Sequence, residues 1–199
     1  MGFWRAGVQS CKRSQGAVAF CGANGLHLYF RPMAAARTVV LEHDRIQRKL
    51  RRMAFQLVEE NAAEKGLVLV GIAPRGAKLA VRLKQHLEEI SALQVDLHEL
   101  ELDKDAPMQS AARFSRGDVD LGGQVVVLVD DVLMSGRTLM YAAAHLITFP
   151  LKRLTTVVLV DRRHRSFPVR ADIVGLTLTT TLQEHISVEF ARKDTVYLT

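Results

Sequence analysis

Two adjacent carboxylates, Asp130 and Asp131, end an apolar run, and a polar turn follows them. We call this the phosphate turn, and it consists of Met134, Ser135, Gly136, Arg137 and Thr138. A carboxylate accepts hydrogen bonds from hydroxyls, whereas a glycine-bearing turn before a helix presents backbone N–H groups to an anion. Because a carboxylate repels a phosphate, the two chemistries must lie a few residues apart, as they do here. The pattern predicts a ligand with vicinal hydroxyls and a phosphate, which means a sugar phosphate.

The same residues have a plainer explanation, namely a strand with polar ends followed by a capped helix without any ligand. Two aspartates after a strand favour that explanation when they are considered alone. The complete succession of apolar strand, Asp-Asp, Ser-Gly-x-Thr and helix is much more specific, and it favours the ligand site.

Two strand–turn–helix units are expected to position this chemistry. The apolar run Val125–Val129 shows no alternation, which is typical of a central strand covered on both faces, and a helix is predicted over Leu139–Ile147. The second unit is a strand over Leu67–Ile72, a turn with Pro74, Arg75 and Gly76, and a helix over Ala77–Ile90. Its turn should open at the same sheet edge, where Arg75 can pair with an anion and Gly76 can bring backbone donors close. We also predict a cis peptide bond before Pro74.

The remaining elements give an α/β fold with a mainly parallel sheet, flanking helices and a small hood. An amphipathic helix is expected over Asp44–Glu64, ended by Gly66. A loop, Leu102–Leu121, carries Arg113 and Arg116, which are candidates to cover a bound anion. The expected strands are Val95–Leu102 near the sheet edge, Leu154–Val160, Ile173–Leu178 and Ile186–Phe190, with Thr179–Gln183 in the hood.

Length and charge indicate one domain with a separate leader. A chain of 199 residues can bury a sizeable core. Of the net charge of +6, residues 1–32 carry +4, from four basic residues and no acid, so the rest of the chain is near balance at +2. We expect residues 1–32 to be a basic, disordered leader and residues 33–199 to be the domain.

Both cysteines, Cys11 and Cys21, lie in the leader, where a single pair without further ligands is a poor metal signal. Reduced thiols in a cytoplasmic protein are the expected state. No stretch has the apolar length that spans a bilayer, so we expect no membrane partner.

The central motif resembles the phosphoribosyl-pyrophosphate (PRPP) signature of type I phosphoribosyltransferases. Within that family, the chain resembles the PyrR group, pyrimidine-operon attenuation proteins with uracil phosphoribosyltransferase activity. The similarity runs from about Thr38 to Glu189, and the motifs that carry it are Leu69–Ile72 with Arg75-Gly76, the signature itself, Val158–Arg162, His164-Arg165, Pro168–Asp172 and Val174-Gly175.

The resemblance implies transfer of a phosphoribosyl group from PRPP to a nucleobase, a pyrimidine such as uracil, with release of pyrophosphate. Asp130 and Asp131 would hold the ribose hydroxyls, the phosphate turn the 5′-phosphate, and Pro74, Arg75 and Gly76 the pyrophosphate. Asp131 would be catalytic, as a stabiliser of positive charge or as acceptor of a base proton. Mg²⁺ would come with PRPP, near Asp130, without direct protein ligands. A homo-oligomer is also implied.

The alternative is a PyrR-like regulator that binds RNA or nucleotide and keeps the PRPP pocket as a sensor. A basic loop with Arg162, Arg165 and Arg170 is the candidate base or RNA face, although pairing with nearby acids would equally explain these arginines. Arg51 and Phe55 replace a threonine and a histidine usual in the group, which counts against RNA. Arg163 replaces a glycine, which predicts against a left-handed backbone there.

Overall fold

The computed structural model describes residues 20–22, 25–27, 37–103, 112–117, 119–180 and 184–199. The chain forms two compact units, Met1–Ala36 and Arg37–Thr199. In the first unit, β1 (Phe20–Gly22) pairs antiparallel with β2 (Gly25–His27). The rest of the predicted leader lies outside the described residues, so its disorder and its boundary at Met33 stay predictions.

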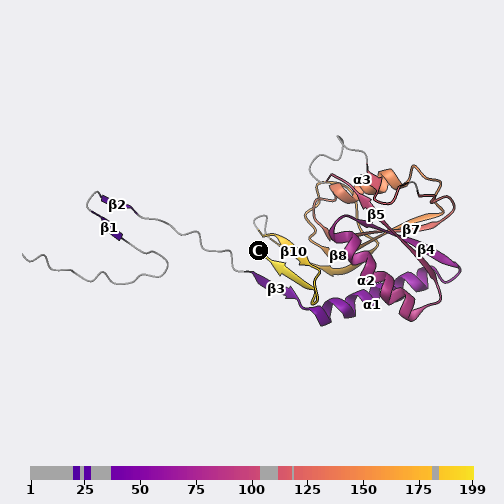
Figure 1. The fold of residues 1–199 in the computed structure, drawn as a ribbon, viewed down its shortest axis with the longest axis horizontal. Helices are drawn as coiled ribbons and strands as arrows, with labels where there is room; N and C mark the ends of the chain where they lie inside the picture. Colours follow the sequence, from indigo (N-terminus) through magenta and orange to yellow (C-terminus); the bar gives the residue numbers. More distant parts are fainter. Residues whose placement is uncertain (1–19, 23–24, 28–36, 104–111, 118, 181–183) are drawn as a thin grey trace, which may run out of the picture. The chain divides into compact units, whose positions relative to one another are not determined.

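A six-stranded sheet forms the centre of the second unit (Figure 1), with the strand order β6-β5-β4-β7-β8-β9. Every neighbouring pair is parallel except β5 and β6, and this confirms the predicted α/β fold. The strands are β4 (Gly66–Ile72), β5 (Gln94–Glu101), β6 (Arg113–Phe114), β7 (Val125–Leu133), β8 (Arg153–Asp161) and β9 (Ile173–Thr177).

Helices cover both faces of this sheet (Figure 1): α1 (His43–Glu60) and α2 (Arg75–Ile90) on one face, and α3 (Arg137–Leu146) on the other. Alternate side chains of β4 point to opposite faces. Leu67 and Leu69 belong to the core that contains α1 and α2, while Val68 and Val70 belong to the core that contains α3. Because both faces are buried, β4 from Leu67 to Ile72 and the first part of β7, Val125–Val129, carry no polar side chain.

A second, three-stranded sheet, which we call the hood, has the order β10-β11-β3. Its strands are β3 (Thr38–Leu41), β10 (Ile186–Glu189) and β11 (Thr195–Leu198), and they pair antiparallel. The apolar side chains of the hood join the core on the α1–α2 face; they are Leu41, Ile186, Val188 and Val196. The proposed hood segment Thr179–Gln183 contributes no strand where it is described, and 181–183 lie outside the described residues.

The first helix is shorter than predicted. It ends at Glu60, because the Asn61 side chain donates to the Leu57 carbonyl at 2.7 Å and the backbone leaves the helical conformation there. Gly66, the predicted end of the helix, is instead the first residue of β4. The other helices are displaced by one or two residues: α2 begins at Arg75 and α3 at Arg137.

The central strand is longer than predicted. Pairing of β7 with β4 ends at Val129, but its pairing with β8 continues as far as Leu133. Asp130 and Asp131 therefore belong to a strand that runs beyond its neighbour on one side, and they do not follow its end.

The predicted loop Leu102–Leu121 contains β6, whose Arg113 lies opposite Glu101 of β5. Arg113 Nε donates to Glu101 Oε2 at 2.9 Å. This hydrogen bond, together with one from the Ser115 hydroxyl, holds the pKa of Glu101 below its ordinary value. Arg113 is thus engaged at the sheet edge. Residues 104–111 lie outside the described residues.

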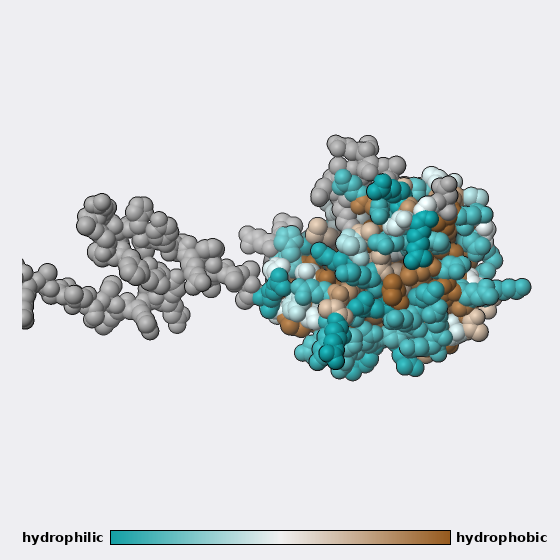
Figure 2. Space-filling model, viewed as in Figure 1, coloured by the Kyte–Doolittle hydropathy of each residue, from teal (hydrophilic) through white to brown (hydrophobic). Residues whose placement is uncertain are grey.

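The surface of the second unit that is visible in Figure 2 is mostly hydrophilic, with small hydrophobic patches between charged residues. Within the described part of the chain, no helix is long and apolar enough to cross a membrane.

An aromatic cluster attaches β6 to α3. The Phe114 ring lies 6.0 Å from the ring of His145 and 6.1 Å from that of Phe149, measured between centroids. Burial lowers the pKa of His145 below its ordinary value of 6.5, because the cluster disfavours the charged imidazolium.

This lowered pKa makes the stability of the protein depend on pH. The unfolded chain binds the proton of His145 more readily than the folded protein does. The stability that neutral His145 contributes is therefore fully present above the pKa of His145 in the unfolded chain, and it is lost as the pH falls below that value. We expect His145→Phe to lose less stability than wild type between about pH 7.5 and pH 5 in urea denaturation. An identical pH dependence of the two proteins would contradict the assignment.

Candidate active site

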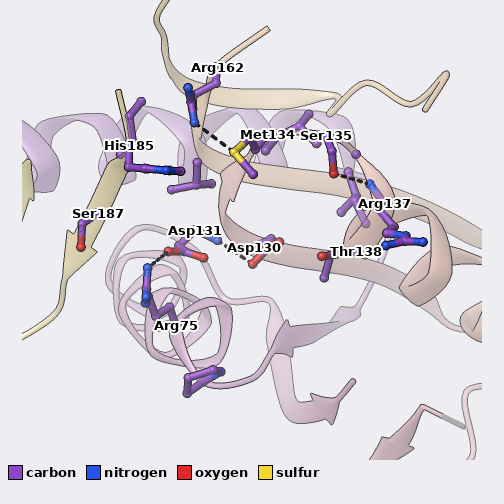
Figure 3. Close-up of a pocket in the computed structure, with 16 residues that line it drawn as sticks. Arg75, Asp130, Asp131, Met134, Ser135, Arg137, Thr138, Arg162, His185 and Ser187 are labelled. Carbon is purple, nitrogen blue, oxygen red and sulfur yellow. Dashed lines mark hydrogen bonds and ion pairs between the residues drawn. The ribbon is translucent and has the colours of Figure 1, made fainter. Parts of the chain in front are cut away.

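A cavity of about 630 Å³ opens where β7, the starts of α2 and α3, and the hood meet (Figure 3). Its lining comes from stretches that are distant in the sequence: Pro74 and Arg75, Asp130–Leu139, Arg162, and His185–Ser187. The structure thus brings the predicted acids, the phosphate turn and Arg75 into one cavity. Their roles toward a ligand stay predictions.

The two acids are almost completely buried, and each residue is only 4% exposed. Asp130 Oδ1 accepts a hydrogen bond from the backbone N–H of Asp131 at 3.0 Å. Asp131 Oδ2 lies 3.6 Å from Arg75 Nη1 and receives no hydrogen bond from the described residues. A buried carboxylate oxygen without a donor is costly, so Asp131 Oδ2 is well suited to accept a hydrogen bond from a ligand hydroxyl.

The phosphate turn has the backbone shape of an anion site. Gly136 lies in the left-handed region, with φ of 83°, immediately before α3. The Ser135 hydroxyl accepts the N–H of Arg137 at 3.3 Å, and the Ser135 carbonyl accepts N–H groups from Ser166 and Phe167. These hydrogen bonds fix the conformation of the turn. The first N–H groups of α3 have no acceptor within the helix.

The turn between β4 and α2 begins with a cis peptide bond between Ala73 and Pro74, as predicted. Pro74 and Arg75 line the cavity, but Gly76 is not among its lining residues. A Cβ on Gly76 would lie 2.5 Å from the Val129 carbonyl oxygen. Gly76 is thus needed where α2 approaches β7, and its role in anion binding stays a prediction.

The basic loop is only partly a free basic face. Arg162 is 3% exposed; its Nε donates to the Thr180 hydroxyl at 2.9 Å, and its Nη1 contacts Met134 Sδ. Arg165 pairs with Asp161 and lines a neighbouring cavity of about 490 Å³. Arg170 is exposed and lines neither of these two cavities. Of the two explanations for these arginines, pairing with a nearby acid is therefore confirmed for Arg165.

The backbone prediction for Arg163 is wrong. Arg163 has a left-handed conformation with φ of 58°, although it is not a glycine. Its N–H donates to Asp161 Oδ1 at 2.9 Å, and this hydrogen bond offsets the cost of the conformation.

Sequence reasoning missed one wall of the cavity, formed by His185, Ile186 and Ser187 of the hood. His185 is held by paired backbone hydrogen bonds with Thr199, at 2.6 and 2.8 Å. The alternation around Ile186 predicts a strand but not its position over the acids, because the pairing of β10 with β11, and of β11 with β3, brings it there.

No cluster of three or more His, Cys, Asp or Glu side chains that could hold a metal exists among the described residues. The two carboxylates alone fit a Mg²⁺ ion that is bound mostly by substrate oxygens and water, which is the preference of that ion.

Comparison with known proteins decides the family. A model of the phosphoribosyl transferase domain matches residues 37–194. The chain belongs to the phosphoribosyltransferase family. The matched range spans every residue that lines the cavity.

Relatives with PyrR names support the resemblance within the family. The bifunctional protein PyrR of Leuconostoc mesenteroides is 37% identical over 166 residues, which cover 79% of this chain and 95% of that protein. The PyrR of Haemophilus ducreyi is 33% identical over 165 residues, covering 79% and 92%. A pyrimidine operon regulatory protein of Lactococcus lactis is 34% identical over 165 residues, covering 80% and 93%.

Solved structures confirm the type I phosphoribosyltransferase fold. A hypoxanthine phosphoribosyltransferase of Trypanosoma cruzi matches with a TM-score of 0.63 at 19% identity, over 75% of this chain and 84% of that one. A hypoxanthine-guanine phosphoribosyltransferase of Bacillus anthracis matches with a TM-score of 0.61 at 20% identity, over 71% and 82%. At such identities the likeness concerns the fold alone.

The geometry of Gly136 yields a test of the phosphate turn. An added Cβ would strain the left-handed backbone and lie 2.4 Å from Val169 Cγ1. We expect Gly136→Ala to lower the free energy of unfolding by about 2–4 kcal/mol and to abolish detectable binding of ribose 5-phosphate. Urea denaturation and calorimetry measure the two effects.

Gly123→Ala is the matched control, because Gly123 also has a left-handed φ, of 66°, with nothing within 4 Å of an added Cβ. It should cost only about 1–2 kcal/mol and leave ligand binding intact. Equal ligand binding by the two variants would argue against the phosphate turn.

Proposed function

We propose that this protein transfers the 5-phosphoribosyl group of PRPP to a ring nitrogen of a pyrimidine, with uracil as the acceptor and pyrophosphate as the leaving group. The observation that carries the proposal is the meeting of Asp130, Asp131, the phosphate turn and Arg75 in one cavity. The family membership and the PyrR relatives support this choice of reaction and acceptor.

The acids would bind the ribose. Vicinal hydroxyls donate hydrogen bonds. When they are ionised, the carboxylates of Asp130 and Asp131 accept hydrogen bonds and have none to donate. The 5′-phosphate would lie in the phosphate turn, where the N–H groups at the start of α3, the helix dipole and the Thr138 hydroxyl favour an anion. The two ends of the sugar phosphate are then fixed by separate parts of the strand–turn–helix unit.

The pyrophosphate would lie toward Arg75, whose side chain is half exposed and whose Nη1 reaches Asp131. Its guanidinium fork suits phosphate oxygens and can exchange its distant contact with Asp131 for them. Mg²⁺ bound with the substrate near Asp130 would neutralise charge on the leaving pyrophosphate.

Transfer breaks the bond between C1 of the ribose and pyrophosphate and forms one from C1 to the base nitrogen, which loses its proton. Positive charge develops on the ribose when the leaving group departs first. Asp131 is buried beside the expected ribose position and would stabilise that charge or accept the proton of the base. The base would lie between Arg162 and the hood wall, which face Asp131 across the cavity (Figure 3).

Removal of the Asp131 charge tests this proposal. We expect Asp131→Asn to keep the fold and to lower kcat for uracil-dependent pyrophosphate release at least about 100-fold, because an amide neither stabilises cationic charge nor accepts the proton. Asp96→Asn, at an exposed position of β5, is the control and should retain full activity. The proposal would be refuted if the wild-type protein, given PRPP and Mg²⁺, released no pyrophosphate with any base of a panel of nucleobases.

The second candidate function is regulation, because the Lactococcus lactis relative is named a pyrimidine operon regulatory protein, and RNA is the ligand that we consider for it. The exposed side of α1 is rich in arginine, including Arg45, Arg48 and Arg51. Two other cations of α1 are already bound: Lys49 and Arg52 donate to backbone carbonyls of β9. Burial beside Arg52 and Arg45 lowers the pKa of Lys49.

Salt dependence separates the two functions. If RNA is a ligand, its affinity should fall steeply with salt, and replacement of Arg45, Arg48 and Arg51 by glutamine should weaken it while transferase activity persists. RNA binding that is unaffected by these changes would exclude α1 as the contact surface.

A further inference from the structure

One buried carboxylate, Asp194, joins the hood to both helices of the adjacent layer. Asp194 lies between β10 and β11 in the sequence, and it is 1% exposed. Arg82 of α2 binds it through two hydrogen bonds, Nε to Oδ2 at 2.7 Å and Nη2 to Oδ1 at 2.6 Å. Gln47 of α1 donates to the same Oδ2 at 3.0 Å. The carboxylate is thus held by side chains from two helices.

Further contacts fix the partners of Asp194 in turn. The Arg82 guanidinium lies 4.8 Å from the centroid of the Phe190 ring and donates to the Ala191 carbonyl. His86 lies 2.9 Å from Gln47 Oε1. Arg82 therefore contacts three residues of the segment between β10 and β11, and the contact with His86 restricts the movement of Gln47.

The hood needs such a connection because its strands do not pair with the main sheet. Its apolar side chains pack on the α1–α2 core, but hydrophobic contact is not directional and permits small sliding movements. A bidentate arginine–carboxylate pair, in contrast, fixes both distance and direction.

Both ends of this connection lead to the cavity. On α2, Arg75 lines the cavity and Arg82 follows two helical turns later. In the hood, β10 and the preceding His185 provide the wall, and the chain after β10 leads to Asp194. The distance between the hood wall and the start of α2 therefore depends on the Arg82–Asp194 pair.

We propose that Asp194 is a positioning residue that, through Arg82, sets the hood wall at the distance at which it binds the nucleobase. The inference rests on the proposed function, because it takes the hood wall as the base side of the cavity. Asp194 itself lines neither cavity described above, so it acts only through the position of the hood.

Binding of two ligands separates positioning from general stability. Uridine monophosphate carries ribose, phosphate and base, whereas ribose 5-phosphate lacks the base. We expect Asp194→Asn to weaken uridine monophosphate about ten-fold in calorimetry and to leave ribose 5-phosphate within about two-fold, since only the base reaches the hood. Loss of mere stability would weaken both ligands alike.

A double-mutant cycle assigns the effect to the pair. Arg82→Gln should weaken uridine monophosphate as Asp194→Asn does, and the double variant should be no worse than either single variant. Arg37→Met is the matched control, because it breaks an ion pair with Glu189 inside the hood, at 3.0 Å, without a link to the helices. It should change neither affinity.

The outcomes distinguish the inference from the function beneath it. If wild type binds both ligands and Asp194→Asn weakens neither, or both equally, the inference is wrong and the proposed function stands. If wild type binds neither ligand, the proposed function is wrong and the inference falls with it.

Discussion

The structure depends on the burial of two neighbouring carboxylates within its central strand, just beyond Val129, where the pairing of that strand with β4 ends. Asp130 and Asp131 are each 4% exposed, and a buried carboxylate is costly unless donors or cations compensate it. A backbone N–H donates to Asp130, whereas Asp131 Oδ2 accepts no hydrogen bond from the described residues and has Arg75 Nη1 at 3.6 Å. We propose that the hydroxyls of an activated sugar phosphate donate to the unsatisfied oxygen of Asp131.

The fold explains how two acids can occupy this position. The pairing of β7 with β4 ends at Val129, while its pairing with β8 continues to Leu133. The edge of β7 that faces β4 is therefore unpaired beyond Val129. Gly76 lets α2 start directly against Val129, and Gly136 lets α3 start just after the same strand. Two helix starts and a strand end thus meet, and their N–H groups provide the positive counterpart of the acids. The hood then closes the remaining side.

Local signals made much of this arrangement predictable. The unbroken apolar run before Asp130 indicated a central parallel strand, and the succession from Asp130 to Thr138 indicated an anion turn beside acids. What failed depended on long-range contacts. β3 and β11 are short strands that exist only because they pair across most of the chain, and the left-handed Arg163 depends on a hydrogen bond to Asp161. The place of His185 over the acids could not be predicted either, because no local pattern specifies how the hood packs on the α1–α2 core.

Calorimetric titration of PRPP with Mg²⁺ into wild type and into the Asp130→Asn/Asp131→Asn double variant tests the central claim most directly. The account predicts binding of one PRPP per chain to wild type and none that can be measured to the folded double variant. Equal binding of PRPP by both proteins, or no binding by wild type, would contradict it.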